Sequence, residues 1–142
     1  MIVYLDTSAL LKLYVEEAGR EVVREAMGAA EVAATSTVAY AEARAALARL
    51  LREGDFTEAE HRQVVERLDR EWRGYHRLAV SDLVARRAGE LAQRHALRGF
   101  DAIHLASAAR LEERFRDLSF LAFDGRLLDA AKEASMSVYG GS

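Results

Sequence analysis

The sequence predicts an α/β fold in which helices flank a short parallel central sheet. Short apolar runs alternate along the chain with longer segments of helical periodicity, as in parallel sheets covered by helices. The 142 residues include no proline, and no repeat, linker or low-complexity segment divides them. A chain of this length is typical of one domain, so we expect residues 1–142 to form a single domain.

Two strands and four helices are expected in the first half of the chain. The strands are predicted by short apolar runs at residues 2–5 and 32–35. The helices are predicted by apolar residues three and four positions apart, over residues 7–15, 20–30, 38–52 and 58–75. Glu53-Gly54-Asp55 separates the two long helices, and Thr57 is a suitable N-cap for the second of them.

The second half continues the same alternation. Apolar runs predict strands at residues 78–80 and 120–123 and a short edge strand at 137–139. Helical periodicity covers residues 81–96, 100–115 and 126–134. Ser81 is expected to cap the first of these helices, and Arg98-Gly99 interrupts the pattern before the second.

Composition excludes several classes of protein. Hydrophobic residues make up 51% and charged residues 30% of the chain, with a net charge of −3, which is typical of a soluble domain. The longest apolar stretch without charge, residues 32–41, is about half as long as a membrane-spanning helix requires. No export signal is visible at the N-terminus, so we expect a cytoplasmic protein. The absence of cysteine excludes thiolate nucleophiles and zinc–thiolate sites.

Two aspartates directly follow predicted strands: Asp6 and Asp124. The C-terminal ends of parallel strands form the edge at which such sheets bind ligands. Each of the two would also serve as a helix N-cap, and Asp101 suits the first turn of its helix on electrostatic grounds. Glu42 lies opposite the expected packing stripe of its helix, where a solvent-exposed acid is common. Taken singly, none of these acids identifies a site.

Four segments in this order resemble the PIN-domain ribonucleases of bacterial and archaeal toxin–antitoxin systems, the VapC toxins. They are residues 3–14 (VYLDTSALLKLY), 36–42 (STVAYAE), 99–108 (GFDAIHLASA) and 121–128 (LAFDGRLL). The resemblance covers essentially the whole chain and implies a PIN-like three-layer α/β/α fold. It also implies that Asp6, Glu42, Asp101 and Asp124 are catalytic and share a divalent-metal site, with Thr7 or Ser8 as a supporting polar group. Ala122 departs from the family, in which many members have threonine at this position.

The same resemblance implies a Mg²⁺-dependent endoribonuclease, with Mn²⁺ as a substitute, that hydrolyses phosphodiester bonds in RNA. Carboxylates suit this chemistry because both metals prefer hard oxygen ligands and polarise water for attack on phosphorus. The resemblance further implies the toxin of a pair with a VapB-type antitoxin. It suggests a homodimer in which the helices over residues 38–75 form the dimer and antitoxin-binding element.

Arginine supplies most of the positive charge of the chain. Most arginines are interspersed with acids along helices, where we expect them to form ion pairs. Arg98, beside Gly99-Phe100-Asp101, is the one that we expect to contact RNA. His104 shares a helix face with Leu105, so we expect it to be packed or to support the site.

Two alternative functions remain open at this point. A haloacid-dehalogenase-like phosphatase also begins with a strand followed by aspartate, but it has a second aspartate two residues later, where this chain has Ser8. A non-catalytic receiver-like module would have adjacent acids early and a lysine at a strand end, whereas here Asp6 stands alone and Lys132 comes late. An inactive PIN domain is disfavoured by retention of all the acids. Cleavage assays with RNA and with phosphatase substrates separate these alternatives.

Overall fold

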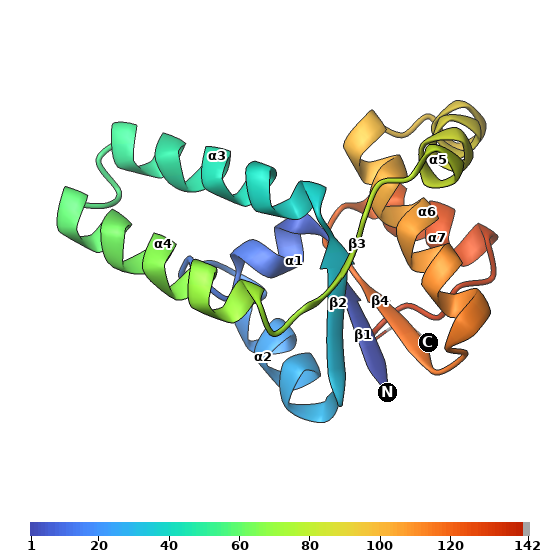
Figure 1. Cartoon of the computed structure of the whole chain (residues 1–142), viewed down its shortest axis with the longest axis horizontal. Helices are drawn as coiled ribbons and strands as arrows, with labels where there is room; N and C mark the ends of the chain where they lie inside the picture. The colour runs from blue at the N-terminus through green and yellow to red at the C-terminus, as the bar shows by residue number, and fades with distance from the viewer. Residues whose placement is uncertain (141–142) are drawn as a thin grey trace.

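Four parallel strands form the central sheet of the computed structural model, which describes residues 1–140 (Figure 1). They are β1 (Ile2–Leu5), β2 (Val32–Ser36), β3 (His76–Leu78) and β4 (Leu118–Leu121), in the spatial order β3-β2-β1-β4. Ile2 of β1 pairs with Val32 on one side and with Leu118 on the other. Because all the strands are parallel, their C-terminal ends lie at one edge of the sheet, where the candidate site residues are expected.

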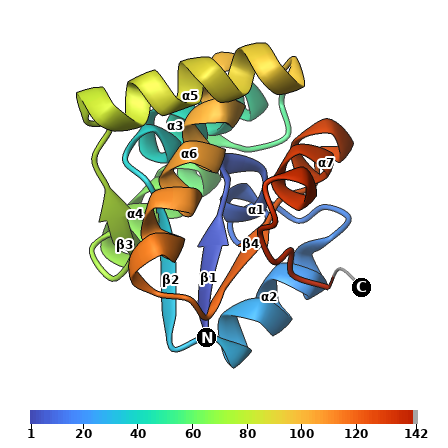
Figure 2. The ribbon, with the colours of Figure 1, turned by 90° about the vertical axis from the view of Figure 1, so that its right-hand side faces the viewer.

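Seven helices within residues 1–140 cover the sheet on both sides. They are α1 (Thr7–Leu11), α2 (Arg20–Ala29), α3 (Val38–Arg52), α4 (Glu58–Trp72), α5 (Asp82–His95), α6 (Gly99–Arg114) and α7 (Gly125–Glu133). Figure 1 places α1 to α4 on one side of the sheet and α5 to α7 on the other, and Figure 2 looks onto the second side. The predicted three-layer α/β/α architecture is therefore confirmed.

Alternating side chains of β1 belong to two core clusters, one on each side of the sheet. Val3 and Leu5 pack on one side of the sheet with buried residues of α1 to α4. Tyr4 points to the other side, where it stacks on Phe120 and packs with Leu105 of α6. A central parallel strand is buried on both faces, which explains why residues 2–5 are apolar throughout.

Helices α3 and α4 form a pair that extends away from the sheet (Figure 1). Thr57 caps α4 as predicted: its side chain accepts a hydrogen bond from the Glu60 backbone, and the Glu60 carboxylate accepts one from the Thr57 backbone. Such a capping box stabilises a helix start by satisfying two backbone donors. Within residues 1–140, no helix is long and apolar enough to cross a membrane.

Several predicted boundaries were wrong, and the partner strands explain two of them. The fourth strand spans Leu118–Leu121 rather than 120–123, because Leu121 pairs with Leu5, the last residue of β1. The third strand spans His76–Leu78 rather than 78–80, since it pairs only with the end of β2. It is an edge strand, so it does not need apolar residues on both faces.

Three further predictions extended regular structure too far. The helix predicted over residues 7–15 ends at Leu11, after which the chain continues in tight turns. The helix predicted over 58–75 ends at Trp72, just before Gly74. The predicted edge strand at 137–139 contributes only one bridge, between Val138 and Phe120.

Candidate active site

The four acids singled out in the sequence come from four separate segments around the C-terminal edge of the sheet. Asp6 directly follows β1, and Glu42 lies in the second turn of α3, which follows β2. Asp101 is in the first turn of α6. Asp124 precedes α7 and is separated from β4 by Ala122-Phe123, so the expectation that it directly follows a strand was wrong.

Asp6 combines helix capping with deep burial. Its Oδ1 atom accepts hydrogen bonds from the Ser8 hydroxyl at 2.7 Å and from the Ala9 backbone at 2.9 Å, as the N-cap of α1. Only 3% of the residue is exposed. Burial raises the pKa of Asp6, and the nearby negative charge of Asp101 adds to this rise. Ser8 therefore orients a carboxylate that is costly to ionise in this environment.

Glu42 is not the solvent-exposed acid that its position on the helical wheel predicts. Its Oε1 atom accepts a hydrogen bond from the Thr7 hydroxyl at 2.5 Å and lies 3.2 Å from Nε2 of His104. Burial opposes ionisation of this carboxylate, but the hydrogen bonds from His104 and Thr7 outweigh it, and the pKa of Glu42 is lowered. Glu42 is thus held as an ionised, oriented carboxylate.

His104 is the residue whose importance the sequence indicated least clearly. It is buried as expected, with 1% of the residue exposed, and it contacts Thr7 and Glu42 through Nε2. Its Nδ1 atom lies 2.9 Å from the hydroxyl of Tyr4. Nothing in the sequence had indicated that Tyr4 supports the site. The signal that could have found His104 is its spacing of three residues from Asp101, which places both on neighbouring positions of one helix.

Arg98 and Asp101 form an ion pair at the entrance to α6. Nε of Arg98 donates to Oδ2 of Asp101 at 3.1 Å, while 82% of the arginine side chain remains exposed. The hydrogen bond to Asp101 raises the pKa of Arg98, and the charges of Asp124 and Glu42 contribute to the same rise. The guanidinium therefore lies within the electrostatic influence of three of the four acids.

Two adjoining hollows meet at this ion pair, since both are lined by Arg98 and Asp101. The larger, of about 460 Å³, is also lined by Glu42, Gly99, Phe100 and Ile103. The smaller, of about 330 Å³, is also lined by Ala96, Leu97, Asp124, Gly125 and Arg126. Asp124 is exposed there and caps α7 by accepting from the Leu127 backbone at 3.0 Å. Arg98 and Asp101 thus connect the Glu42 side of the edge to the Asp124 side.

The donor set suits a hard divalent cation, because every acid offers carboxylate oxygen. Within residues 1–140, however, no three acidic or histidine side chains lie close enough together to form a ready-made metal site. The positive charge nearest to Asp101 is the Arg98 guanidinium. Binding of a cation by all the acids would therefore require their side chains to turn toward one another.

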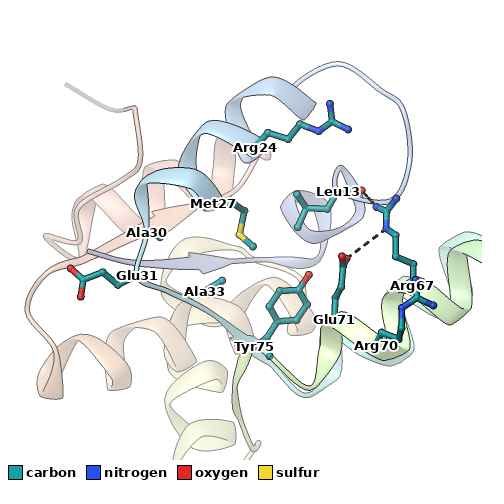
Figure 3. A pocket seen from close by; sticks show the side chains of 11 residues that line it. Leu13, Arg24, Met27, Ala30, Glu31, Ala33, Arg67, Arg70, Glu71 and Tyr75 are labelled. Carbon is teal, nitrogen blue, oxygen red and sulfur yellow. Dashed lines mark hydrogen bonds and ion pairs between the residues drawn. The ribbon is translucent and has the colours of Figure 1, made fainter.

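A larger cavity than either of these hollows lies elsewhere, at the other end of β2. It has a volume of about 700 Å³ and lies between α2, the start of β2 and the end of α4 (Figure 3). Arg67 contacts the carbonyl of Leu13 and pairs with Glu71 on its wall. None of the four candidate acids lines this cavity.

The chain is similar to proteins of known fold and named activity. A model of the PIN domain family matches residues 3–133. Ribonuclease VapC45 of Mycobacterium tuberculosis (strain CDC 1551 / Oshkosh) is 39% identical over 107 residues, which cover 75% of this chain and 74% of that one. The crystal structure of FitAcB from Neisseria gonorrhoeae aligns with a TM-score of 0.71 at 21% identity, covering 98% of this chain and 96% of that one. A toxin–antitoxin complex from Klebsiella pneumoniae aligns with a TM-score of 0.61 at 21% identity, covering 86% of each chain.

Proposed function

Because the chain belongs to the PIN domain family, we propose that it is a divalent-metal-dependent endoribonuclease that hydrolyses phosphodiester bonds in RNA. Family membership leaves the haloacid-dehalogenase-like and receiver-like alternatives without support. A relative named as a ribonuclease, aligned over three quarters of each chain, supports the activity.

The observation that carries this proposal is the environment of Asp6. Its carboxylate is almost fully buried, and both burial and the charge of Asp101 raise its pKa. Carboxylates gathered in one place repel one another, and a bound cation relieves this repulsion. The four acids lie around one edge of the sheet, which supports a shared role for Asp6 in addition to its capping of α1.

Asp6, Glu42, Asp101 and Asp124 are the residues that would hold Mg²⁺ or Mn²⁺. When bound, such an ion polarises a water molecule and stabilises negative charge on the phosphate. The remaining roles belong to the protein itself. Ser8 and the Ala9 backbone fix the orientation of Asp6. Thr7, with His104, fixes that of Glu42, and Arg98 would attract the RNA backbone.

We further propose that the protein acts in the cytoplasm as the toxin of a pair with a VapB-type antitoxin. The relative's name and the shared fold with a chain of a toxin–antitoxin complex support this role. Homodimer formation and antitoxin binding through α3 and α4 are part of the same proposal, because this helix pair extends away from the sheet (Figure 1). Expression should arrest growth, and co-expression of the antitoxin should relieve the arrest. The mass of the purified protein, measured by light scattering, tests whether it is a homodimer.

The cleavage assay tests the proposed activity. Wild type should cleave RNA with Mg²⁺ or Mn²⁺ and lose cleavage in EDTA. Asp101→Asn should be inactive because it removes a proposed ligand. Asp82→Asn is the matched control, because Asp82 also occupies the first turn of a helix but lies exposed beside Arg86. Undiminished cleavage in EDTA, or equal loss in both variants, would contradict the metal site. Turnover of phosphomonoesters instead of RNA would contradict the reaction class.

A further inference from the structure

Phe100 exposes its ring beside the candidate active site. The residue is 55% exposed, the highest value among the exposed large hydrophobic residues of the described chain. It lies in the first turn of α6, directly before Asp101, and it lines the same hollow as Glu42 and Arg98. Single exposed apolar side chains are common on protein surfaces, so the significance of this ring comes from its place in the hollow that Glu42 and Arg98 also line.

The other exposed phenylalanines differ from Phe100 in their surroundings. A cation lies over each of their rings: Lys12 Nζ is 4.3 Å from the centre of the Phe123 ring, and the Arg114 guanidinium is 5.8 Å from that of Phe115. Among residues 1–140, no aromatic ring or cation is stacked on Phe100. No other ring or cation of the described chain therefore competes with a planar partner for the exposed part of this ring.

The walls of the hollow combine apolar and charged groups. Ile103 follows Phe100 by three positions on the same helix, so the two side chains lie on neighbouring positions of one face. Arg98 supplies a positive charge next to these apolar groups, and Glu42 and Asp101 supply the carboxylates. The volume of about 460 Å³ is that of a small-molecule pocket.

A nucleotide has the same combination of groups: a flat apolar base joined to an anionic phosphate. If the scissile phosphate lies at the carboxylates and Arg98, an adjacent base reaches the wall of the same hollow. A protein partner would explain the exposed ring, but it would not explain why the ring lies in the same hollow as Arg98 and the candidate catalytic acids. We propose that Phe100 stacks on an unpaired nucleobase next to the scissile phosphate and thereby favours single-stranded over duplex RNA, without selecting a particular base. This inference rests on the proposed ribonuclease function.

Stacking and ionic attraction differ in their dependence on salt. An aromatic ring accepts any base, because every base has a flat face, and it contributes to affinity without releasing counterions. Contacts between arginine and phosphate weaken as salt increases. Loss of Phe100 should therefore lower affinity without changing the salt dependence of binding.

The test measures binding of a fluorescein-labelled RNA oligonucleotide by anisotropy in EDTA, which prevents metal-dependent cleavage. The RNA has mixed sequence without self-pairing and is used alone and annealed to its complement. Phe100→Ala should weaken binding of the single strand by about 5- to 150-fold, the range measured for loss of one stacked base. Phe100→Tyr should restore it. Binding of the duplex, whose bases are already stacked, and the slope against log salt should not change.

Phe115→Ala is the matched control, because Phe115 is an exposed phenylalanine at the opposite end of the same helix. The affinity of the Phe115→Ala variant for the single strand and for the duplex should equal that of wild type. An RNA that contains 2-aminopurine reports stacking directly: its fluorescence should fall on binding to wild type and much less on binding to Phe100→Ala. Circular dichroism of each variant establishes that it is folded.

Three results would overturn the inference. Equal loss of single-stranded and duplex binding would show a general contact, and equal loss in Phe115→Ala would show an effect unrelated to the site. Unchanged RNA binding together with loss of self-association in Phe100→Ala would assign the ring to a protein interface. If wild type cleaves RNA in each of these cases, the ribonuclease function stands and only the stacking role fails. If wild type cleaves no RNA with either metal, both proposals fail.

Discussion

Nε2 of His104 lies 3.2 Å from Oε1 of Glu42, and this contact joins α6 to α3 beside the end of β1. The donor of each hydrogen bond around His104 can be assigned from the hydrogens that its neighbours have available. Thr7 donates its only hydroxyl hydrogen to Glu42, so its oxygen must accept from Nε2–H of His104 at 3.0 Å. In the neutral imidazole Nδ1 then lacks a hydrogen and accepts from the hydroxyl of Tyr4 at 2.9 Å. These contacts therefore favour, for the neutral imidazole of His104, the tautomer that carries its hydrogen on Nε2.

His104→Gln should lower both stability and cleavage. A glutamine amide cannot occupy the positions of both ring nitrogens, so either Tyr4 or Glu42 loses its contact with residue 104, and loss of a buried hydrogen-bond partner costs about 1–3 kcal/mol. If the amide turns to Tyr4, Glu42 keeps only its contact with Thr7 and its orientation is less restricted. Urea unfolding and RNA cleavage measure the two effects. His76→Gln, on the exposed edge strand, should change neither. Wild-type stability in His104→Gln would contradict the hydrogen-bond arrangement.

Arg98→Ala should strengthen metal binding and weaken RNA binding. The guanidinium pairs with Asp101 and lies near Asp124 and Glu42, so its removal leaves a more negative site that attracts a cation more strongly. Loss of one phosphate contact should also flatten the slope of log affinity against log salt by about 0.7 for single-stranded RNA. Calorimetric titration with Mn²⁺ and anisotropy at several salt concentrations measure these changes.

Arg86→Ala provides the control for charge alone. Arg86 is an exposed arginine paired with Asp82 on α5, outside both hollows at the site. Its loss should leave Mn²⁺ binding and the salt slope as in wild type. If Arg98→Ala matched Arg86→Ala in both measurements, Arg98 would have no special position relative to the acids or the RNA.

Asp6→Asn should stabilise the metal-free protein at neutral pH. Burial raises the pKa of Asp6, so the folded state binds a proton more tightly than the unfolded state. Stability is then lost as the pH rises from the ordinary aspartate value of about 3.9 through the raised value. Asparagine still caps α1 and avoids this loss. Unfolding in EDTA across this range should show a smaller pH dependence in Asp6→Asn.

The same variant should respond less to metal. Mn²⁺ at a hundredfold excess over its Kd is expected to stabilise wild type by about 2.7 kcal/mol. Asp6→Asn removes one proposed ligand, so the gain should shrink. A variant that is less stable than wild type in EDTA yet gains the full amount from Mn²⁺ would show that Asp6 only caps the helix.

Gly19→Ala and Gly28→Ala should change stability in opposite directions. Gly19 has a φ of 97°, and a Cβ there would lie 2.7 Å from both Lys12 Cε and Phe123 Cε1. The left-handed conformation alone costs about 1–2 kcal/mol for a residue with a side chain. Gly28 lies in α2 with open space around it, so alanine there should stabilise the helix by up to about 1 kcal/mol. Paired urea unfolding curves would show both signs; a stabilising Gly19→Ala would contradict the close packing at Phe123.

Local sequence signals identified most elements because they act over short distances. The helix over residues 38–52 and the strand over 2–5 have the predicted limits, and Ser81 caps α5 as expected. The limits of two strands failed because a distant partner strand sets them. Phe123 is as apolar as a strand residue, yet it lies beyond the point at which β1 ends and can offer a partner.

The site shows the same division between local and distant causes. Asp6 and Asp124 cap helices, which the residues next to them were enough to indicate. The surroundings of Glu42 depend on His104, which is 62 positions away in the chain, so no helical wheel could reveal them. The ion pairs expected between arginines and acids are also of both kinds. Arg86 pairs with an acid of its own helix, whereas Arg87 pairs with Glu113 of the next helix.

The pairing of β1 with β4 has a consequence for synthesis of the protein. Strand β1 is synthesised well before β4, so this edge of the sheet cannot form until Leu118 is available to pair with Ile2. Asp124 emerges later still, and α7 after it. A nascent chain that ends before Asp124 therefore lacks at least one of the four candidate acids. If these acids form the active site, products that terminate before Asp124 should have no nuclease activity.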